Sequence, residues 1–387
     1  MNPWKVPLAD VVLGSEEIEA VTSVLKSGWL SMGPQTQRFE AAFAQFLGIK
    51  HAFAVANGTA ALHLACEVLD LKAGDEVLCP ALTFVAGANA ILYSRAKPVF
   101  VDIHGPHDLN LSVEDAARKV TERTRAIMVV HYAGYPCNMD GILALARQQG
   151  LKIIEDCAHA PGAVYHSRHG PRKVGTQGDV GCFSFFANKN LTTGEGGMVV
   201  TNDAHLAGKI KLARSHGMTA LTWDRHQGHS FSYDVVAPGY NYRLDEMRAA
   251  LGMVQLSHLQ ENNDRRRQLT LLYRDELQDV KDLDMPFQSA GAGSTHHIFP
   301  VMLKDKVKRS ELMDSLTQKG IQTSIHYPPI HRFSHYRRLW PRDFDHRLPF
   351  TEAAASREVT LPLFPTMRPE QSVAVIQAVK AFFRHRK

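Results

Sequence analysis

The sequence predicts an α/β protein in which a large, mostly parallel sheet is followed by a smaller α/β domain. Short apolar segments recur between His51 and Asn202, each bounded by turn residues, as is typical of strands. Helical patterns separate most of them, which indicates βα alternation. The segments VFVDI and AIMVV are continuously apolar rather than alternating, and this favours strands buried on both faces.

The expected strands and helices alternate along the first half of the chain. The strands are HAFAVA, DEVLCP, KPVFVDI, TRAIMVVHY, LKIIED, DVGCFSFF and GGMVVTN. Helices are expected over 59–69, 84–93, 113–119 and 141–149, after the helices GSEEIEAVTSVLKSG and FEAAFAQFLG of the first 50 residues. A sheet built in this way is covered by helices.

A second domain is expected because a single core stops growing near about 250 to 300 residues, and this chain has 387. A long helical pattern begins at Leu244 and continues to about Leu277, and such a helix can link two domains. It is followed by the strand HHIFPVML, the helix KVKRSELMDSLTQKG, the segment IQTSIHY as a further strand, and a helix over 369–385. We therefore place a large domain at residues 1–250 and a small α/β domain at residues 251–387.

Composition excludes several classes of protein. The chain is 44% hydrophobic and 21% charged, which is the balance of a globular protein and not of a disordered one. Its net charge of +5 is spread along the chain, so no nucleic-acid partner is expected. Five cysteines without a CxxC pair indicate neither a disulfide framework nor a zinc ribbon, and a reducing cytoplasm fits them best. No membrane segment is expected, because the longest uncharged apolar stretch, residues 79–94, is broken by Pro80 and Gly87.

The 20 histidines raise the question of a metal site. Three close pairs stand out, and only one has the i,i+4 spacing of helical ligands: His166 with His169, His226 with His229, and, at that spacing, His331 with His335. None has a carboxylate arranged as in HExxH. We therefore expect solvated histidines and no catalytic metal.

The first candidate site follows the strand HAFAVA and opens a helix at Asn57, Gly58 and Thr59. Free backbone N–H groups at a helix start, a hydroxyl and a glycine that permits close approach together suit an anion such as phosphate. The same residues are also typical of an ordinary helix cap. By itself this motif leaves both interpretations open.

The second candidate site lies at the end of the strand LKIIED. Glu155 and Asp156 end the strand, and His159 follows three residues later. Ligands of α/β folds bind at this end of the strands. The alternative is a strand-end turn with solvated carboxylates and a packed or solvated histidine.

The third candidate site is the segment from Ser184 to Gly197, which contains Lys189. A single lysine leaves an aromatic strand and enters a loop of small polar residues and glycines. An amine that is partly desolvated near a flat ligand has a lowered pKa and becomes a nucleophile, whereas a typical loop lysine is solvated. The glycines do not match GxGxxG, because position 199 is Val, so a dinucleotide fold is disfavoured.

Together the three sites supply what pyridoxal phosphate (PLP) requires. The helix start provides a phosphate cradle, the strand-end carboxylate keeps the pyridine nitrogen protonated, and the lysine provides the amine for a Schiff base. The combination is far more specific than any of its members.

The chain resembles the DegT/StrS-type PLP-dependent sugar-nucleotide aminotransferases, which have the aspartate-aminotransferase-like fold, PLP fold type I. The resemblance covers nearly the whole chain. It rests on the motifs SGWLSMGP, VANGTAALHLA, CPALTFVA, PVFVDI, IIEDCAHAPGA, GCFSFFANKNLTTGEGGMVVTND, GYNYRL, IHYPPIH and LPL.

The resemblance implies three catalytic residues. Lys189 would form the Schiff base with the cofactor and then carry protons, Asp156 would face the pyridinium nitrogen, and His159 would lie near the ring hydroxyl. The resemblance also places Phe84 against the ring.

The same resemblance implies residues for the phosphate and the sugar. Thr59, the Gly58 backbone and Ser184 would hold the phosphate, joined by Asn241 of the partner subunit in a homodimer with shared active sites. His326 would approach the sugar.

The function that the resemblance implies is transfer of an amino group from an amino acid, with glutamate the first choice, to a keto group of a nucleotide-linked deoxysugar. Position 4 of the sugar is favoured and position 3 is second. One alternative is a PLP-binding sensor, although the first 50 residues contain no basic recognition face. Another is a PLP sugar dehydratase, although such relatives carry His where Lys189 stands. The loop 216–232, with Trp223, Arg225, His226 and His229, is expected to contact either the substrate or the partner.

Overall fold

A computed structural model of the chain describes residues 4–168, 170–220, 223, 226, 228, 232–288, 293–304, 307–339 and 348–384. His169, Arg225 and His229, which the sequence analysis named, lie outside the described residues, as does the expected end of the last helix at His385.

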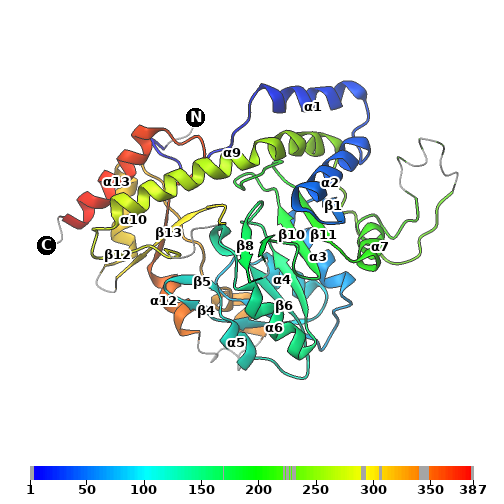
Figure 1. The fold of residues 1–387 in the computed structure, drawn as a ribbon, viewed down its shortest axis with the longest axis horizontal. Helices are drawn as coiled ribbons and strands as arrows, with labels where there is room; N and C mark the ends of the chain where they lie inside the picture. The colour runs from blue at the N-terminus through cyan, green and yellow to red at the C-terminus, as the bar shows by residue number, and fades with distance from the viewer. Residues whose placement is uncertain are drawn as a thin grey trace.

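The large sheet has seven strands, and all seven coincide with strands expected from the sequence (Figure 1). Their order is β1-β11-β10-β7-β6-β2-β3, and β11 alone runs antiparallel to its neighbours. The strands are β1 (His51–Val55), β2 (Glu76–Pro80), β3 (Lys97–Val101), β6 (Thr124–Val130), β7 (Lys152–Asp156), β10 (Val180–Ser184) and β11 (Gly197–Thr201). The prediction of a mostly parallel sheet is therefore confirmed.

Helices cover both faces of this sheet, which explains the continuous apolar character of its strands. Val77 and Cys79 of β2 pack on the side of α3 (Gly58–Val68), α4 (Ala86–Tyr93) and α7 (Ala204–Ala213). Leu78, between them, packs on the opposite side with α5 (Val113–Arg118) and α6 (Met139–Gln149). Because successive side chains of a strand point to opposite faces, burial of both faces requires an apolar residue at every position.

A long helix, α9 (Glu246–Leu277), runs from the large sheet to the C-terminal part of the chain (Figure 1). Its 32 residues correspond to a length of about 48 Å. Leu259 packs in the core under the large sheet with α2 (Pro34–Leu47), whereas Tyr273 and Leu277 pack in the core of the C-terminal part. Helix α1 (Ser15–Ser27) lies along α9.

The C-terminal part is built on a small antiparallel sheet, β12-β13-β14, with α10 (Arg309–Gln318) and α13 (Pro369–Arg384) packed against it. The strands are β12 (Leu283–Asp284), β13 (Phe299–Leu303) and β14 (Glu358–Leu361). The segment IQTSIHY, expected as a strand, forms only isolated bridges, so this expectation was wrong. After Ser324 pairs with Thr360, the chain leaves the sheet and places His326 and Tyr327 in a cavity instead.

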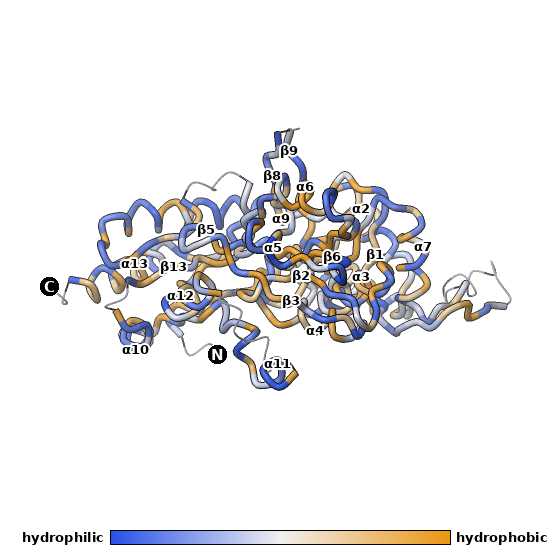
Figure 2. Tube along the Cα trace, turned by 90° about the horizontal axis from the view of Figure 1, so that it is seen from below, coloured by the Kyte–Doolittle hydropathy of each residue, from blue (hydrophilic) through white to orange (hydrophobic). Residues whose placement is uncertain are grey.

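Short elements complete the fold. Figure 2 shows that the apolar residues concentrate inside the layers and that the hairpin of β8 and β9 projects from the body. None of the helices in the described part of the chain combines the length and the apolar character that a membrane span requires. The short elements outside the two sheets and the main helices are β4 (Ile103–Gly105), β5 (Asp108–Leu111), β8 (Val164–Ser167), β9 (Gly170–Lys173), the 3₁₀ turns η1 (Tyr132–Gly134) and η2 (Ile330–Arg332), α11 (Ser334–Leu339) and α12 (Pro349–Arg357).

Candidate active site

A cavity of about 700 Å³ lies at the carboxyl ends of the parallel strands of the large sheet. α/β folds place their ligands at this position, and the volume suits a cofactor with part of a substrate. Eight of the nine residues that were expected to act in catalysis or to bind cofactor or substrate line this one cavity: Gly58, Thr59, Phe84, Asp156, His159, Ser184, Lys189 and His326.

Lys189 follows β10 and contributes the amine of the cavity. Its backbone N–H donates to the Phe186 carbonyl at 2.9 Å, which closes the turn that directs the chain into the cavity. Burial lowers the pKa of Lys189 to about 8, and the nearby Asp156 acts against this fall. Among the described residues its Nζ has no hydrogen-bond partner. The amine is therefore suited to act as a nucleophile.

Asp156 ends β7 and is buried, so the alternative of a solvated strand-end carboxylate is wrong. Its Oδ1 accepts a hydrogen bond from the Ala158 N–H at 3.0 Å. Burial raises the pKa of Asp156, and the Ala158 N–H and the charge of Lys189 act against this rise. A cationic ring nitrogen in the cavity would also act against this rise and would stabilise the ionised carboxylate of Asp156.

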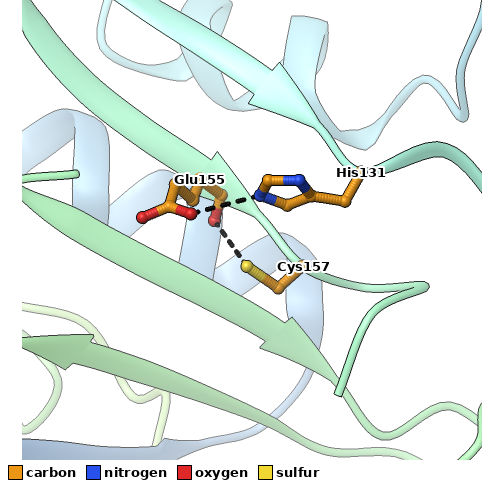
Figure 3. Close-up of side chains that lie close together, drawn as sticks. All are labelled: His131, Glu155 and Cys157. Carbon is orange, nitrogen blue, oxygen red and sulfur yellow. Dashed lines mark hydrogen bonds and ion pairs between the residues drawn. The ribbon is translucent and has the colours of Figure 1, made fainter. Parts of the chain in front are cut away.

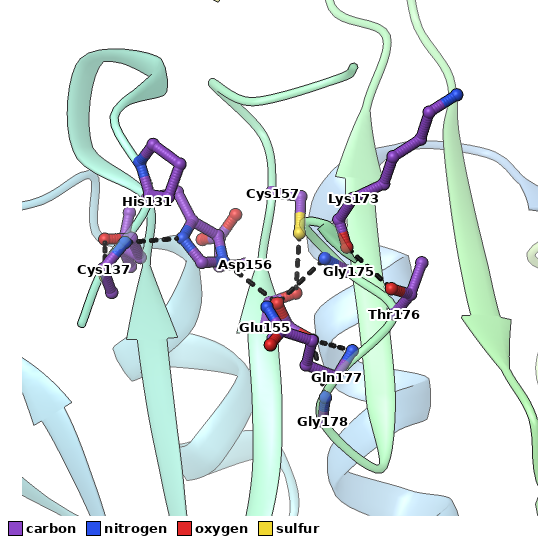
Figure 4. A network of polar contacts seen from close by, with 12 residues as sticks. His131, Cys137, Glu155, Asp156, Cys157, Lys173, Gly175, Thr176, Gln177 and Gly178 are labelled. Atoms are coloured by element: carbon purple, nitrogen blue, oxygen red, sulfur yellow. Dashed lines mark hydrogen bonds and ion pairs between the residues drawn. The ribbon is translucent and has the colours of Figure 1, made fainter. Parts of the chain in front are cut away.

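Glu155, the other acid of the motif, does not line the cavity and lies in a buried polar network (Figure 4). Its carboxylate accepts backbone N–H groups of Gly175, Gln177 and Gly178 at 2.6 to 2.8 Å. Burial acts to raise the pKa of Glu155, but the hydrogen bond from His131 and these N–H groups hold it below its ordinary value. Glu155 therefore fastens the loop before β10 to β7, and its role is structural.

His131, Glu155 and Cys157 lie close enough together to suggest a metal site (Figure 3). Their contacts favour a hydrogen-bond cluster instead. The Cys137 N–H donates to His131 Nδ1 at 3.0 Å, so Nε2 carries the hydrogen and donates to Glu155 at 3.2 Å. Burial also raises the pKa of the Cys157 thiol well above its ordinary value, which opposes the thiolate form that binds metals.

His159 lies in the cavity together with a residue that the sequence analysis missed, Tyr327. The Ala133 N–H donates to His159 Nδ1 at 3.3 Å, so Nε2 carries the hydrogen and donates to the Tyr327 hydroxyl at 3.0 Å. Burial, followed by the charge of Lys189, holds the pKa of His159 well below its ordinary value. Tyr327 directly follows His326 in the motif IHYPP, and this adjacency is the feature from which it could have been found.

The helix start of α3 combines the two interpretations that its sequence left open. Asn57 is an ordinary cap, whose side chain accepts the Ala60 N–H at 2.8 Å, while Gly58 and Thr59 line the cavity. A Cβ atom at Gly58 would lie 2.7 Å from the Ser184 Cβ, so only glycine lets the helix start approach the end of β10 this closely. Free N–H groups of the helix start and the hydroxyls of Thr59 and Ser184 thus surround one end of the cavity.

The remaining predicted residues lie at the mouth of the cavity or outside it. Phe84 is 59% exposed, and its ring lies 6.1 Å from that of Tyr327. Asn241 is exposed and does not line the cavity of its own chain. The rings of Trp223 and His226 pack edge-on and tilted against Trp29, with centroid distances of 4.8 and 4.6 Å, so these two loop residues contact their own chain.

The residues of the cavity fit PLP. The lysine amine, the buried carboxylate and the helix start lie around one space. These groups suit the aldehyde, the pyridine nitrogen and the phosphate of PLP, in that order. Asn188 also lines this space, and in the described part of the chain its buried Oδ1 has no hydrogen-bond partner. An α/β fold with this site defines a PLP-dependent aminotransferase of fold type I.

Comparison with known proteins gives the family. The model of the DegT/DnrJ/EryC1/StrS aminotransferase family matches residues 12–380. The chain belongs to this family and is a PLP-dependent sugar aminotransferase.

Individual relatives are similar over almost their whole length. The spore coat polysaccharide biosynthesis protein SpsC of Bacillus subtilis is 39% identical over 386 residues, which cover 98% of this chain and 96% of SpsC. The structure of Helicobacter pylori PseC, an aminotransferase involved in the biosynthesis of pseudoaminic acid, has a TM-score of 0.90 at 30% identity and covers 98% and 99% of the two chains. That of S. venezuelae DesV has a TM-score of 0.87 at 35% identity, with coverage of 95% and 94%.

Proposed function

We propose that this enzyme transfers an amino group from an amino acid, glutamate in the first instance, to the keto group of a nucleotide-linked deoxysugar. Position 4 of a 4-keto-6-deoxyhexose is the first choice for the keto group, and position 3 is the second. Support comes from the family and from the named roles of SpsC and PseC in the biosynthesis of spore coat polysaccharide and of pseudoaminic acid.

One observation carries the proposal: the amine of Lys189 and the carboxylate of Asp156 line the same cavity. Burial brings the pKa of Lys189 to about 8, so that an unprotonated amine is accessible near neutral pH. A dehydratase of this superfamily would have His at this position. The lysine therefore favours transamination.

The residues of the cavity would bind the cofactor and transfer protons. When bound, PLP supplies the electron sink that stabilises a substrate carbanion. Lys189 would hold it covalently and then carry a proton between the cofactor and substrate carbons. Asp156 would keep the ring nitrogen protonated, and Phe84 would cover the ring.

The phosphate would be held at the helix start by Gly58, Thr59 and Ser184. We infer that Asn241 of the partner subunit completes this site in a homodimer. The exposure of Asn241 and its position outside the cavity of its own chain support this assignment.

The substrate is tested by incubating the PLP-loaded enzyme with glutamate and a panel of nucleotide keto sugars, followed by mass spectrometry. We expect an amino sugar nucleotide to form together with 2-oxoglutarate. A product that has lost water would indicate a dehydratase. Bound PLP that never exchanges its amino group with any donor would indicate a sensor.

A further inference from the structure

Behind the cavity, a buried carboxyl is linked to an imidazole through one hydroxyl. Glu358 begins β14 and is fully buried, and Thr360 lies two residues further along the same strand. The Thr360 hydroxyl is hydrogen-bonded to Glu358 Oε1, and Thr360 Oγ1 lies 2.8 Å from His326 Nδ1. His326 in turn lines the cavity. We call this chain of Glu358, Thr360 and His326 the relay.

The second oxygen of Glu358 determines where a proton on this carboxyl must lie. Oε2 accepts the backbone N–H of His326 at 2.9 Å. A backbone N–H can only donate, so Oε2 remains an acceptor in every protonation state. The carbonyl oxygen of a protonated carboxyl is its better acceptor, so we place a proton bound by Glu358 on Oε1, next to Thr360.

The relay then has two arrangements. With Glu358 ionised, Thr360 donates to Oε1 and accepts from His326 Nδ1–H, which leaves Nε2 as an acceptor. With Glu358 protonated, Oε1–H donates to Thr360, Thr360 donates to Nδ1, and Nε2 carries the hydrogen. Burial, followed by the charge of Lys189, lowers the pKa of His326 to about 4, so the imidazole is neutral in both arrangements.

We propose that Glu358 and Thr360 are positioning residues that set the tautomer of His326 and thereby decide whether the cavity offers the sugar a hydrogen-bond donor or an acceptor. In the described part of the chain, His326 Nε2 has no hydrogen-bond partner, so it is available to a keto or hydroxyl oxygen of the sugar. The identity of that ligand rests on the proposed function, whereas the tautomer is a property of the protein.

The surroundings of the relay favour the donor form at neutral pH. Burial raises the pKa of Glu358 to about 8, and Arg309 on α10 acts against the rise without cancelling it. Strand β13, which pairs with Glu358 through Met302, contains no titratable side chain. The other titratable groups facing the relay are Tyr132 and Tyr327, whose pKa values are raised by burial, His159 and His297, whose pKa values are lowered by burial, and the amine of Lys189.

The first test reads the tautomer directly, by nitrogen-15 NMR of the holoenzyme labelled at histidine, with His326→Gln to assign the signals. We expect Nε2–H well below the Glu358 pKa of about 8 and Nδ1–H well above it. In Glu358→Gln, the amide oxygen faces the His326 N–H and the amide nitrogen donates to Thr360, so Nε2–H should persist at both pH values. Nδ1–H below the Glu358 pKa, or a pH-dependent tautomer in Glu358→Gln, would overturn the proposal.

The second test removes the hydroxyl of the relay. Thr360→Val keeps the shape of the side chain, and we expect it to raise the KM for the keto sugar about five- to tenfold, the value of one hydrogen bond, without changing the half-reaction with glutamate. Thr360→Ser should restore the KM. Thr351→Val is the matched control, since Thr351 is buried and its hydroxyl has no hydrogen-bond partner within the described residues.

The two tests separate this inference from the proposed function. The NMR measurement needs no substrate, so the absence of a sugar product would reject the proposed function while the relay is still judged on its tautomer. A tautomer that still changes with pH in Thr360→Val as it does in the wild type would reject the relay. An unchanged sugar KM in that variant would reject its role toward the substrate.

Discussion

The Lys189 amine is subject to two opposed influences, burial and a neighbouring carboxylate. Burial prevails and brings the pKa to about 8. Compared with an exposed lysine, this change increases the unprotonated fraction at neutral pH by roughly 300-fold. The Lys189 amine therefore lines the cavity and is more often in the unprotonated form that acts as a nucleophile.

Lys189 should be the lysine that carries the cofactor. Borohydride reduces a Schiff base to a stable amine, so peptide mapping of the reduced holoenzyme should find the pyridoxyl mass on the peptide that contains Lys189. Lys173 provides a comparison, because burial lowers its pKa too although it lies outside the cavity. A label on Lys173, or on any other lysine, would contradict the assignment.

Asp156 should matter more to catalysis than to folding. Asp156→Asn keeps the shape of the side chain but removes the charge that favours a protonated ring nitrogen, so kcat should fall by about 100-fold or more. The thermal unfolding midpoint should stay close to that of the wild type. The exposed Asp314→Asn on α10 serves as a control for both measurements. Near-normal turnover of Asp156→Asn would contradict this catalytic role of Asp156.

At the scale of elements, one carboxylate joins the start of α9 to the start of α2. Glu246 accepts the backbone N–H groups of Gly33, Gln35 and Thr36 at 2.7 to 2.9 Å, together with the Thr36 hydroxyl. These N–H groups belong to the N-cap and first turn of α2 and have no partner within that helix. A residue about 210 positions away in the sequence therefore caps the helix.

Glu246→Gln should destabilise the protein by roughly 1–3 kcal/mol, because the amide N–H₂ would face a backbone N–H of α2 and leave a buried donor unsatisfied. Denaturant unfolding of the holoenzyme measures this loss. Glu19→Gln on the exposed side of α1 removes the same charge without a buried contact and should be neutral. Equal stability of the two variants would show that the cap contributes nothing.

The same scale shows where sequence patterns failed. All seven strands of the large sheet were predicted, because burial on both faces leaves a continuous apolar run. In the C-terminal part, Glu358–Leu361 begins with a buried acid and has only four residues, so its pattern did not indicate a strand. The segment IQTSIHY has the composition of a strand, but it forms only isolated bridges, and its last two residues, His326 and Tyr327, line the cavity.

At the scale of the whole molecule, the cavity draws its residues from both parts of the chain. Lys189 and Asp156 come from the large sheet, whereas His326 and Tyr327 come from the C-terminal part. Helix α9 packs in both cores and thereby relates the two groups of residues. The division into residues 1–250 and 251–387 stays a prediction.

A homodimer with shared sites should be revealed by complementation. Lys189→Ala and Asn241→Ala chains, each inactive alone, should regain partial activity when mixed, because the hybrid contains one intact composite site. Activity is measured on hybrids whose formation is confirmed by native mass spectrometry. No recovery in such hybrids would place Asn241 within its own subunit's site or outside the site altogether.

The sequence by itself indicated the large α/β sheet and three groups around the cavity, the helix start at Gly58 and Thr59, Asp156 and Lys189, because strand burial and the chemistry of a helix start, a strand-end acid and a lone lysine are local properties. Only the tertiary structure decided how adjacent residues divide their roles. Asp156 lines the cavity while Glu155 fastens a loop, since successive side chains of a strand point to opposite faces. It also decided the contacts between distant residues, such as Tyr327 with His159 and Glu358 with His326. No spacing in the sequence predicts such contacts, because only the folded chain brings the two residues together.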